Sequence, residues 1–422
     1  FCAPVIFSHG HLAELVREQP DCILLPHMIR VREKDEFTDT HFCPYVQSHP
    51  SVLAASNVLT DYQGKVLAPV IRFAVGWPGM ARELHEAFKA VVDVSLDEVE
   101  AALTTALAAQ REFESEIKAA GRSVLGRLEQ NNEMRVVGLG RPDNVNDPGV
   151  NVALPEKIGE MGVTVIPMDC VEPGTLEDRW YNMYWNYGQE IVRVARRVLE
   201  SDNLFGIMFS NFSCGPDSYI MTYFKEIMHE RRKPFLIVQF DAHGADAGYV
   251  TRVEAALESF RAWRPERRKE PPTPTVRRGL PRQKTIFVPP MAPIGAQLFA
   301  AAFQSDGYHA EVLREDDETM HVGYRHTMGG ECSPCPSTLG SFIRTVEDRG
   351  LEPSQVALFI PHASGPCRFG QYACLDHLLL QKKGWGDVQI ISPGAPNSNT
   401  GMPRHLRVLP WTAHVCRDIL NK

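Results

Sequence analysis

Two segments of the chain share a construction that places a cysteine beside a helix. GIMFSNFSCGPDSYI, from Gly206, and VALFIPHASGPCRFGQY, from Val356, each run from an apolar strand through a cysteine into a helix. Ligands of open α/β sheets bind at such strand-to-helix turns, and the free N–H groups of a helix N-terminus favour anionic sulfur. Cys214 and Cys367 are therefore predicted to be metal ligands.

Four further cysteines lie just ahead of other predicted helices. Cys2 lies in FCAPVIFSHGHLAEL, and Cys43 lies before a proline in HFCPYVQSHPSVLAAS. Cys332 and Cys335 lie in GGECSPCPSTLGSFI. Sorted by position, the six candidates form a first set of Cys2, Cys43 and Cys214 and a second set of Cys332, Cys335 and Cys367. Three thiolates in each set would leave one metal position of a cubane open.

Thiolates in threes suit soft metals, which in a reducing cytosol means zinc or iron–sulfur clusters. Zinc sites normally use four ligands in closely spaced pairs, and only Cys332 and Cys335 have that spacing. Iron–sulfur clusters are therefore preferred over zinc. The other four cysteines, at positions 22, 170, 374 and 416, lie in strand or helix patterns and are interpreted as small hydrophobic residues.

The composition is that of an intracellular enzyme. With 422 residues, 44% of them hydrophobic, the chain can form two or three ordinary domains. Its net charge of −8 argues against a nucleic-acid partner. Ten cysteines over this length are too sparse for a secreted disulfide scaffold, and no apolar run reaches the roughly 18 residues of a membrane span. We expect a cytoplasmic protein without nucleic-acid or membrane partners.

Apolar strands alternate with amphipathic helices, the pattern of an α/β fold with doubly wound parallel sheets. Ser95 followed by Glu98 is a capping box, and it starts a long helix that reaches about Leu128. The expected strands are Cys22–Leu25, Arg135–Leu139, Thr164–Pro167, Phe205–Phe209, Phe235–Phe240, Thr285–Val288, Val356–Ile360 and Val388–Ile391.

A linker divides the predicted fold into two lobes. Residues 264–283 are rich in Pro and Arg and have no apolar periodicity. The first lobe then covers residues 1–263, with a helical insertion at about 73–130, and the second covers residues 284–422. The sequence begins inside the Cys2 motif without a Met, so we expect an N-terminal truncation. Because each cysteine set falls in one lobe, the cluster is expected at the lobe interface.

Three polar residues are candidates for catalysis. QFDAHGADAGYVTRVEA places Asp241, His243 and Asp246 after the strand from Phe235, at the sheet edge where the cluster is expected. There they could relay protons or tune the sulfur ligands through hydrogen bonds. The alternative is that Asp246 and Thr251 cap a helix and the others are solvated.

The segment RVVGLGRPDNVNDPGVN has two glycines after a strand, but it does not predict a dinucleotide site. Its GLG continues into RP, and Pro142 would break the start of the helix that the glycine fingerprint requires. We interpret the segment as a loop on which Arg141, Asp143 and Asn144 shape the interface between the lobes.

A family resemblance rests on seven motifs in order: FCAPVIFSHGHLAEL, FCPYVQ, VVGLGRPDNVNDPGVN, SNFSCGPDSYI, DAHGADAGYVTRVEA, GGECSPC and GPCRFGQY. Together they resemble the dehydratase-like portion of the large CoA-substrate-specific enzyme activases, which are related to 2-hydroxyacyl-CoA dehydratases and to double-cubane cluster proteins. The resemblance covers nearly the whole chain. It implies an oxygen-sensitive protein with iron–sulfur clusters, either of the 4Fe–4S type or a bridged 8Fe–9S double cubane. It also implies a partner ATPase of the actin-like fold that delivers low-potential electrons.

Two departures from the family pattern shape the expected function. No phosphate-binding segment of the actin-like ATPase is visible, so ATP hydrolysis is expected on a separate activase or a fused upstream part. Two three-cysteine sets in one chain resemble the double-cubane arrangement more than a single dehydratase subunit. We therefore expect an oxidoreductase that takes electrons from the activase and reduces a small molecule. A radical 2-hydroxyacyl-CoA dehydratase component acting on a CoA thioester is the first alternative, and a zinc-stapled scaffold without catalysis is the second. The oligomeric state stays open, with a homodimer as one option.

Overall fold

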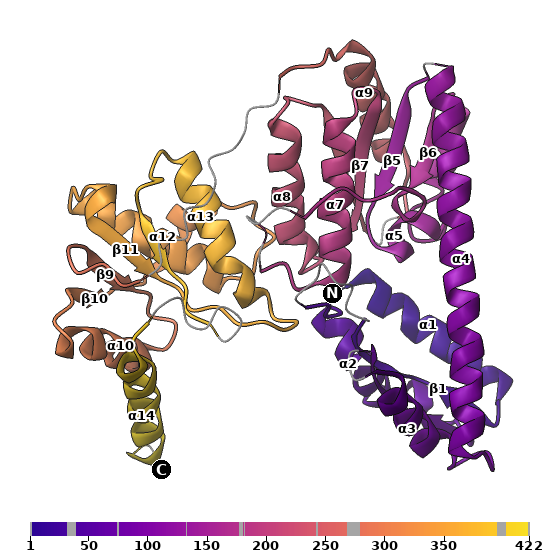
Figure 1. Cartoon of the computed structure of the whole chain (residues 1–422), viewed down its shortest axis with the longest axis horizontal. Coiled ribbons are helices and arrows are strands. Elements are labelled where there is room, and N and C mark those ends of the chain that lie inside the picture. Colours follow the sequence, from indigo (N-terminus) through magenta and orange to yellow (C-terminus); the bar gives the residue numbers. More distant parts are fainter. Residues whose placement is uncertain are drawn as a thin grey trace. The chain divides into compact units, whose positions relative to one another are not determined.

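The computed structural model describes residues 2–31, 39–73, 76–131, 133–176, 180, 182–241, 244–267, 279–394 and 402–420. The chain divides into two compact units, whose elements are labelled in Figure 1. The first unit comprises Phe1–Glu177 and Met183–Pro271, and the second comprises Asp178–Asn182 and Pro272–Lys422. The predicted linker at 264–283 spans this boundary, and its residues 268–278 lie outside the described residues.

The main sheet of the first unit has four parallel strands in the order β6-β5-β7-β8. They are β5 (Arg135–Leu139), β6 (Thr164–Pro167), β7 (Leu204–Asn211) and β8 (Phe235–Phe240). Strands β5 and β7 are buried along their whole length, as parallel strands covered on both faces must be. After β6 the chain crosses back over β5 to add β7 and β8 on the other side. This reversal creates a switch point between the carboxyl ends of β5 and β7, where ligands of doubly wound sheets bind.

Helices cover both faces of this sheet. On one face, α6 (Leu154–Glu160) and α9 (Ala247–Ala262) pack with the strands into a core that includes Ile158, Ile207 and Leu257. Helices α7 (Asn186–Glu200) and α8 (Asp217–His229) pack against each other and against the strands, as Figure 1 shows. The short helix α5 (Pro142–Asn146) follows β5, so the prediction that Pro142 prevents a helix from starting there was wrong; proline is accepted at the first position of a helix.

The N-terminal part of the first unit has two small parallel sheets. β1 (Cys22–Leu24) pairs with β3 (Lys65–Leu67), and β2 (His27–Arg30) pairs with β4 (Val70–Arg72). Helices α1 (Ala3–Glu18), α2 (Pro44–Ala54), α3 (Gly76–Phe88) and α4 (Leu96–Gln130) accompany them. The predicted capping box is confirmed: the Glu98 N–H donates to Ser95 Oγ at 3.3 Å, and the Ser95 N–H donates to Glu98 Oε2 at 2.8 Å.

The second unit repeats the winding of the first. Its parallel strands β9 (Thr285–Val288), β10 (Ala310–Val312), β11 (Val356–Phe359) and β12 (Gln389–Ile391) lie in the order β10-β9-β11-β12. Its helices are α10 (Pro293–Ser305), α11 (Asp317–Tyr324), α12 (Pro334–Asp348), α13 (Tyr372–Lys382) and α14 (Arg404–Leu420). The switch point of this sheet lies between the carboxyl ends of β9 and β11.

The predicted α/β class with doubly wound parallel sheets is therefore confirmed. Helices α3 and α4 occupy the region where the helical insertion was expected. Within the described ranges, no helix combines the length and the apolar character that crossing a membrane requires.

One buried acid in the second unit yields a signed prediction about pH. Asp376 on α13 is 0% exposed, and neither of its carboxyl oxygens has a hydrogen-bond partner among the described residues. Burial raises the pKa of this carboxyl well above its usual range. The folded protein therefore keeps the Asp376 proton at pH values where the unfolded chain releases it, so this residue makes the fold less stable as pH rises above about 4.

We accordingly expect Asp376→Asn, which cannot ionise, to unfold at a higher urea concentration than the wild type at neutral pH. The difference should shrink as the pH is lowered toward about 4, where the unfolded chain also holds the proton. Asp387→Asn, at an exposed position of the same unit, is the control and should change little. An Asp376→Asn protein that is less stable than the wild type at neutral pH would contradict the assignment.

Candidate functional site

The structure places all six predicted cysteines where a helix begins or in the turn before it. Cys2 and Cys43 are the N-cap residues of α1 and α2, and each is followed by a proline in the first turn. Cys367 is the N-cap of a short 3-10 helix, Arg368–Gln371. The others are Cys214, between β7 and α8, and Cys332 and Cys335, at the start of α12. The partial positive charge of a helix N-terminus favours the thiolate form of such residues.

Cys214 lies at the switch point of the first sheet and contacts an arginine from the neighbouring strand end. The Arg141 guanidinium, directly after β5, donates to Cys214 Sγ at 2.8 Å. The same Nη1 lies 3.3 Å from Asp217 Oδ1, at the start of α8. Cys214 is 4% exposed, so this thiol is shielded from water. The structure thus joins a thiol, a guanidinium and a carboxylate at the site where doubly wound sheets bind ligands.

The backbone around this contact is tightly constrained. A Cβ atom at Gly140 would lie 2.5 Å from the Phe209 carbonyl oxygen, so only glycine allows the turn after β5 to approach β7 this closely. Ser213, just before Cys214, has a φ of 63°, a left-handed conformation that is uncommon for residues other than glycine. Both features bring Arg141 and Cys214 together.

A buried polar network supports the pair. Ser210 Oγ donates to Asp217 Oδ2, and Asn211 Nδ2 donates to Asn144 Oδ1. Asn144 is fully buried on α5, and Asp217 is 1% exposed. Burial opposes the charge of Arg141, but Asp217 and the Cys214 sulfur together raise the pKa of Arg141 well above normal. The guanidinium is therefore held positively charged beside the thiol.

The charge of Arg141 also acts on Cys2 of the first set. Burial raises the pKa of the Cys214 thiol, and Arg141 opposes that rise. Burial likewise raises the pKa of Cys2, Arg141 again lowers it, and the neighbouring Cys43 adds to the rise. Cys2 is therefore within electrostatic range of both Arg141 and Cys43. The Arg141 charge therefore acts on two of the three predicted cysteines of the first unit, Cys214 and Cys2.

In the second set, a tyrosine contacts one of the cysteines. The Tyr372 hydroxyl, at the start of α13, lies 2.8 Å from Cys332 Sγ. Burial raises the pKa of Tyr372 most, the hydrogen bond to Cys332 raises it further, and the charges of Cys335 and Cys367 add to the rise. The phenol therefore keeps its proton next to the thiols. The second unit gathers its three cysteines around Tyr372.

The predicted catalytic acids lie at the carboxyl end of β8 and have other partners. Asp246 Oδ2 is 2.6 Å from Lys157 Nζ on α6, and this hydrogen bond lowers the pKa of Asp246. Asp246 is the N-cap residue of α9, as the alternative interpretation expected, although its side chain makes no capping hydrogen bond. Asp241 Oδ1 is 3.5 Å from the Tyr249 hydroxyl. His243 lies outside the described residues, and the catalytic roles of all three stay predictions.

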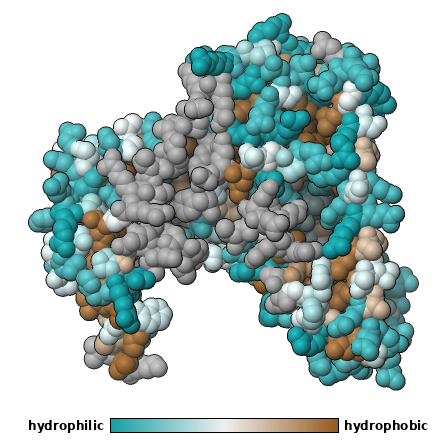
Figure 2. Space-filling view, in the orientation of Figure 1, coloured by the Kyte–Doolittle hydropathy of each residue, from teal (hydrophilic) through white to brown (hydrophobic). Residues whose placement is uncertain are grey.

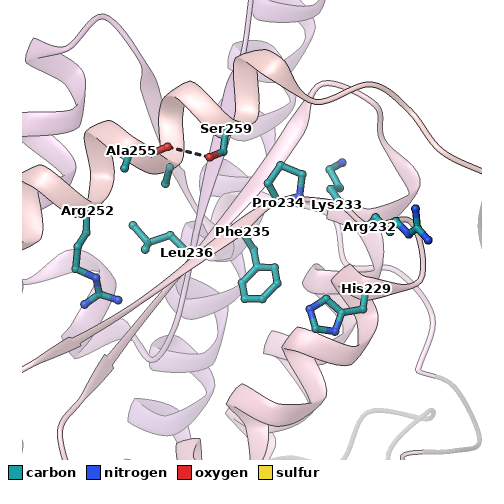
Figure 3. A pocket seen from close by; sticks show the side chains of 10 residues that line it. His229, Arg232, Lys233, Pro234, Phe235, Leu236, Arg252, Ala255 and Ser259 are labelled. Carbon is teal, nitrogen blue, oxygen red and sulfur yellow. Dashed lines mark hydrogen bonds between the residues drawn. The ribbon is translucent and has the colours of Figure 1, made fainter. Parts of the chain in front are cut away.

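A hollow of about 750 Å³ lies at the opposite, amino end of β8, beside Pro234 and Phe235 (Figure 3). Two cationic side chains in its lining donate hydrogen bonds to backbone carbonyl oxygens. Lys233 Nζ donates to the Val198 carbonyl oxygen at 2.7 Å, and Arg252 donates to the Ile237 carbonyl oxygen at 2.6 Å. None of the six cysteines lines this hollow. This hollow and Cys214 therefore lie at different ends of the first sheet.

The chemistry of the two sets fits a soft metal cluster, although their geometry is not that of a finished metal site. Each set has three thiols, and a polar side chain contacts one of them; hydrogen bonds to sulfur ligands tune a cluster. Within the described ranges, however, no group of three or more His, Cys, Asp or Glu side chains is arranged to hold a metal ion. A cluster would therefore require the thiols of each set to move closer together.

Two residues of the site were not predicted as functional. Arg141 was assigned only to an interface loop, since its contact with Cys214 depends on β5 lying next to β7. Tyr372 ends the quoted motif GPCRFGQY and follows Cys367 by little more than one helical turn. A polar aromatic residue so close to a predicted ligand was the signal available for it.

Comparison with known families supports the resemblance seen in the motifs. Residues 1–171 match the model of the CoA enzyme activase uncharacterised domain. The matched region includes the Cys2 and Cys43 motifs and the loop that carries Arg141. No curated protein matches the sequence.

Proposed function

Residues 1–171 belong to the CoA enzyme activase uncharacterised domain family, and from this premise we propose that the chain is an iron–sulfur oxidoreductase. It would accept low-potential electrons from an ATP-dependent activase of the actin-like fold and reduce a small substrate. Cys2, Cys43 and Cys214 would hold one cluster, and Cys332, Cys335 and Cys367 would hold the other, as two 4Fe–4S cubanes or a bridged 8Fe–9S double cubane.

The observation that carries this proposal is a buried polar side chain in contact with a cysteine of each set. Arg141 donates to Cys214 in the first unit, and the Tyr372 hydroxyl contacts Cys332 in the second. A structural cysteine needs neither a buried guanidinium nor a buried phenol, whereas a redox cluster is tuned by donors to its sulfurs. The repetition in both units favours a shared chemical role.

The side chains of each site would act as follows. A bound cluster supplies reversible one-electron storage. The Arg141 guanidinium, oriented by Asp217, offsets negative charge on sulfur, and burial of Cys214 excludes water. The Tyr372 hydroxyl keeps a proton beside Cys332 and stabilises added charge by hydrogen bonding. Asp241, His243 and Asp246 are proposed to relay protons from the edge of the first sheet.

Two other functions remain distinguishable by metal content. A radical 2-hydroxyacyl-CoA dehydratase component, acting on a CoA thioester, would contain about four iron atoms per chain, whereas the proposed reductase would contain about eight. A zinc-stapled scaffold would contain zinc without iron or sulfide. Elemental analysis of anaerobically purified protein can distinguish these three metal contents.

Electron delivery provides the functional test. Because ATP hydrolysis is assigned to the activase, the isolated chain should hydrolyse no ATP, and a mild reductant should leave its visible absorption unchanged. Adding an activase of this family together with ATP should bleach part of that absorption within the same anaerobic cuvette. Substantial ATP hydrolysis by the isolated chain, or complete bleaching by the mild reductant alone, would overturn this division of labour.

A further inference from the structure

Helix α14 is apolar on two opposite faces. One face is buried in the second unit: Leu406 is 1% exposed, and the His414 ring lies 5.5 Å from that of Phe299 on α10. The other face carries four large apolar side chains that are all exposed: Val408 (51%), Trp411 (73%), Val415 (46%) and Ile419 (66%). At 3.6 residues per turn, these four form one stripe on the side away from Leu406.

This stripe has the character of an interface. Single exposed apolar residues are ordinary, but a continuous apolar strip on one helix marks an interaction surface. Its spacing of three and four residues is that of the seam between two packed helices. Trp411 stands near the middle of the strip, and tryptophan is the residue type most enriched at the energetic centres of interfaces. Figures 1 and 2 show α14 and the hydrophobic side chains along it.

We propose that this stripe pairs with the same stripe of a second copy of the chain, with the two helices antiparallel. The stripe is complementary to itself when reversed. Trp411 then packs beside Val415 of the second copy, and Val408 packs beside Ile419 of the second copy. A two-fold axis that passes between the two helices, level with the middle of α14, generates every contact twice, as in a closed dimer.

The charges beside the stripe favour this partner and this orientation. Arg407 and Asp418 are exposed on the same flank of α14, about three turns apart. In an antiparallel pair, Arg407 of each copy lies next to Asp418 of the other, which forms two ion pairs of opposite charge. In a parallel pair, this flank of one helix would lie on the opposite side of the seam from the same flank of the other helix, so these two ion pairs could not form.

The contact area limits the strength of the association. Each copy contributes one helix of 17 residues, which is at the small end of specific protein interfaces. We therefore expect a dimer that forms and dissociates with concentration. Dimer formation through α14 does not depend on the metal content of the chain, so it is tested independently of the proposed function.

Sedimentation velocity of the full chain over a range of concentrations tests the pairing. The wild type should pass from monomer to dimer, and Trp411→Glu should raise the dissociation constant at least about 30-fold. Leu409→Glu is the matched control, because Leu409 is 43% exposed on the same helix but lies off the stripe. It should leave the dimer intact. Both variants should keep the wild-type circular dichroism and unfolding midpoint, because both positions are exposed.

Charge reversal tests the orientation. Arg407→Glu and Asp418→Arg should each weaken the dimer, and the two changes combined in one chain should restore it, because each pair is then reversed as a whole. A wild type that stays monomeric at every concentration, or a dimer that Trp411→Glu leaves unchanged, would overturn the proposal. Monomers that instead bind vesicles of anionic phospholipid through Trp411 would assign the stripe to a membrane surface and overturn it equally.

Discussion

Replacing Cys214 by Ala should remove the cluster of the first unit while leaving most of the fold intact. Iron content should fall from about eight to about four atoms per chain, and the broad visible absorption should fall with it. The effect should be large because this thiol is the buried member of its set and receives the Arg141 hydrogen bond. Loss of one small side chain should cost the fold far less than loss of a large core residue.

The same loss is expected for Cys43→Ala in the first set and for Cys332→Ala and Cys367→Ala in the second. Cys374→Ala is the matched control, since Cys374 is buried at 9% exposure but belongs to neither set. It should keep its full iron content. If all four set variants retained the iron of the wild type, the ligand assignment would be wrong.

The second large effect is expected at Arg141. Arg141→Gln removes the guanidinium from Asp217, whose side chain is 1% exposed, and leaves that carboxylate buried without its cation. Breaking a buried ion pair in this way costs about 3–5 kcal/mol of unfolding free energy. The variant should also bind less iron, because Cys214 loses its hydrogen-bond donor.

Two controls separate these consequences. Arg122→Gln removes an exposed arginine 2.7 Å from Glu172, and such surface pairs contribute at most about 1 kcal/mol. The double change Arg141→Gln with Asp217→Asn removes both charges and should recover much of the stability without restoring the iron. Urea unfolding and iron analysis give the two readouts. A single Arg141→Gln variant as stable as the wild type would refute the buried pair.

Sequence patterns predicted the long strands well because parallel strands covered on both faces are continuous apolar runs. The expected strands Arg135–Leu139, Thr164–Pro167 and Phe235–Phe240 occur with those bounds. The strands His27–Arg30, Lys65–Leu67 and Val70–Arg72 were not predicted. Each is only three or four residues long and includes a charged or polar side chain, so neither alternation nor an apolar run identifies it.

The site was predicted in part for a similar reason. A cysteine before a helix is a local pattern, so the motifs indicated Cys2, Cys43, Cys214 and the second set directly. The contact between Arg141 and Cys214 is not local, because it depends on the order β5-β7 in the sheet. The sequence also did not indicate the direction of side chains: Asp246 is the N-cap residue of α9, but its carboxylate pairs with Lys157 and makes no capping hydrogen bond.

The central claim is that each unit holds its own cluster through its own three cysteines. Its most direct test is iron and acid-labile sulfide analysis of three anaerobically purified proteins: the wild type, a variant with Cys2, Cys43 and Cys214 replaced by Ala, and one with Cys332, Cys335 and Cys367 replaced by Ala. We predict about eight iron atoms per chain in the wild type and about four in each triple variant if the clusters are separate cubanes. A bridged double cubane would lose more than half of its iron in each variant. Wild-type protein that contains zinc or no metal, or triple variants that keep all of their iron, would contradict the claim.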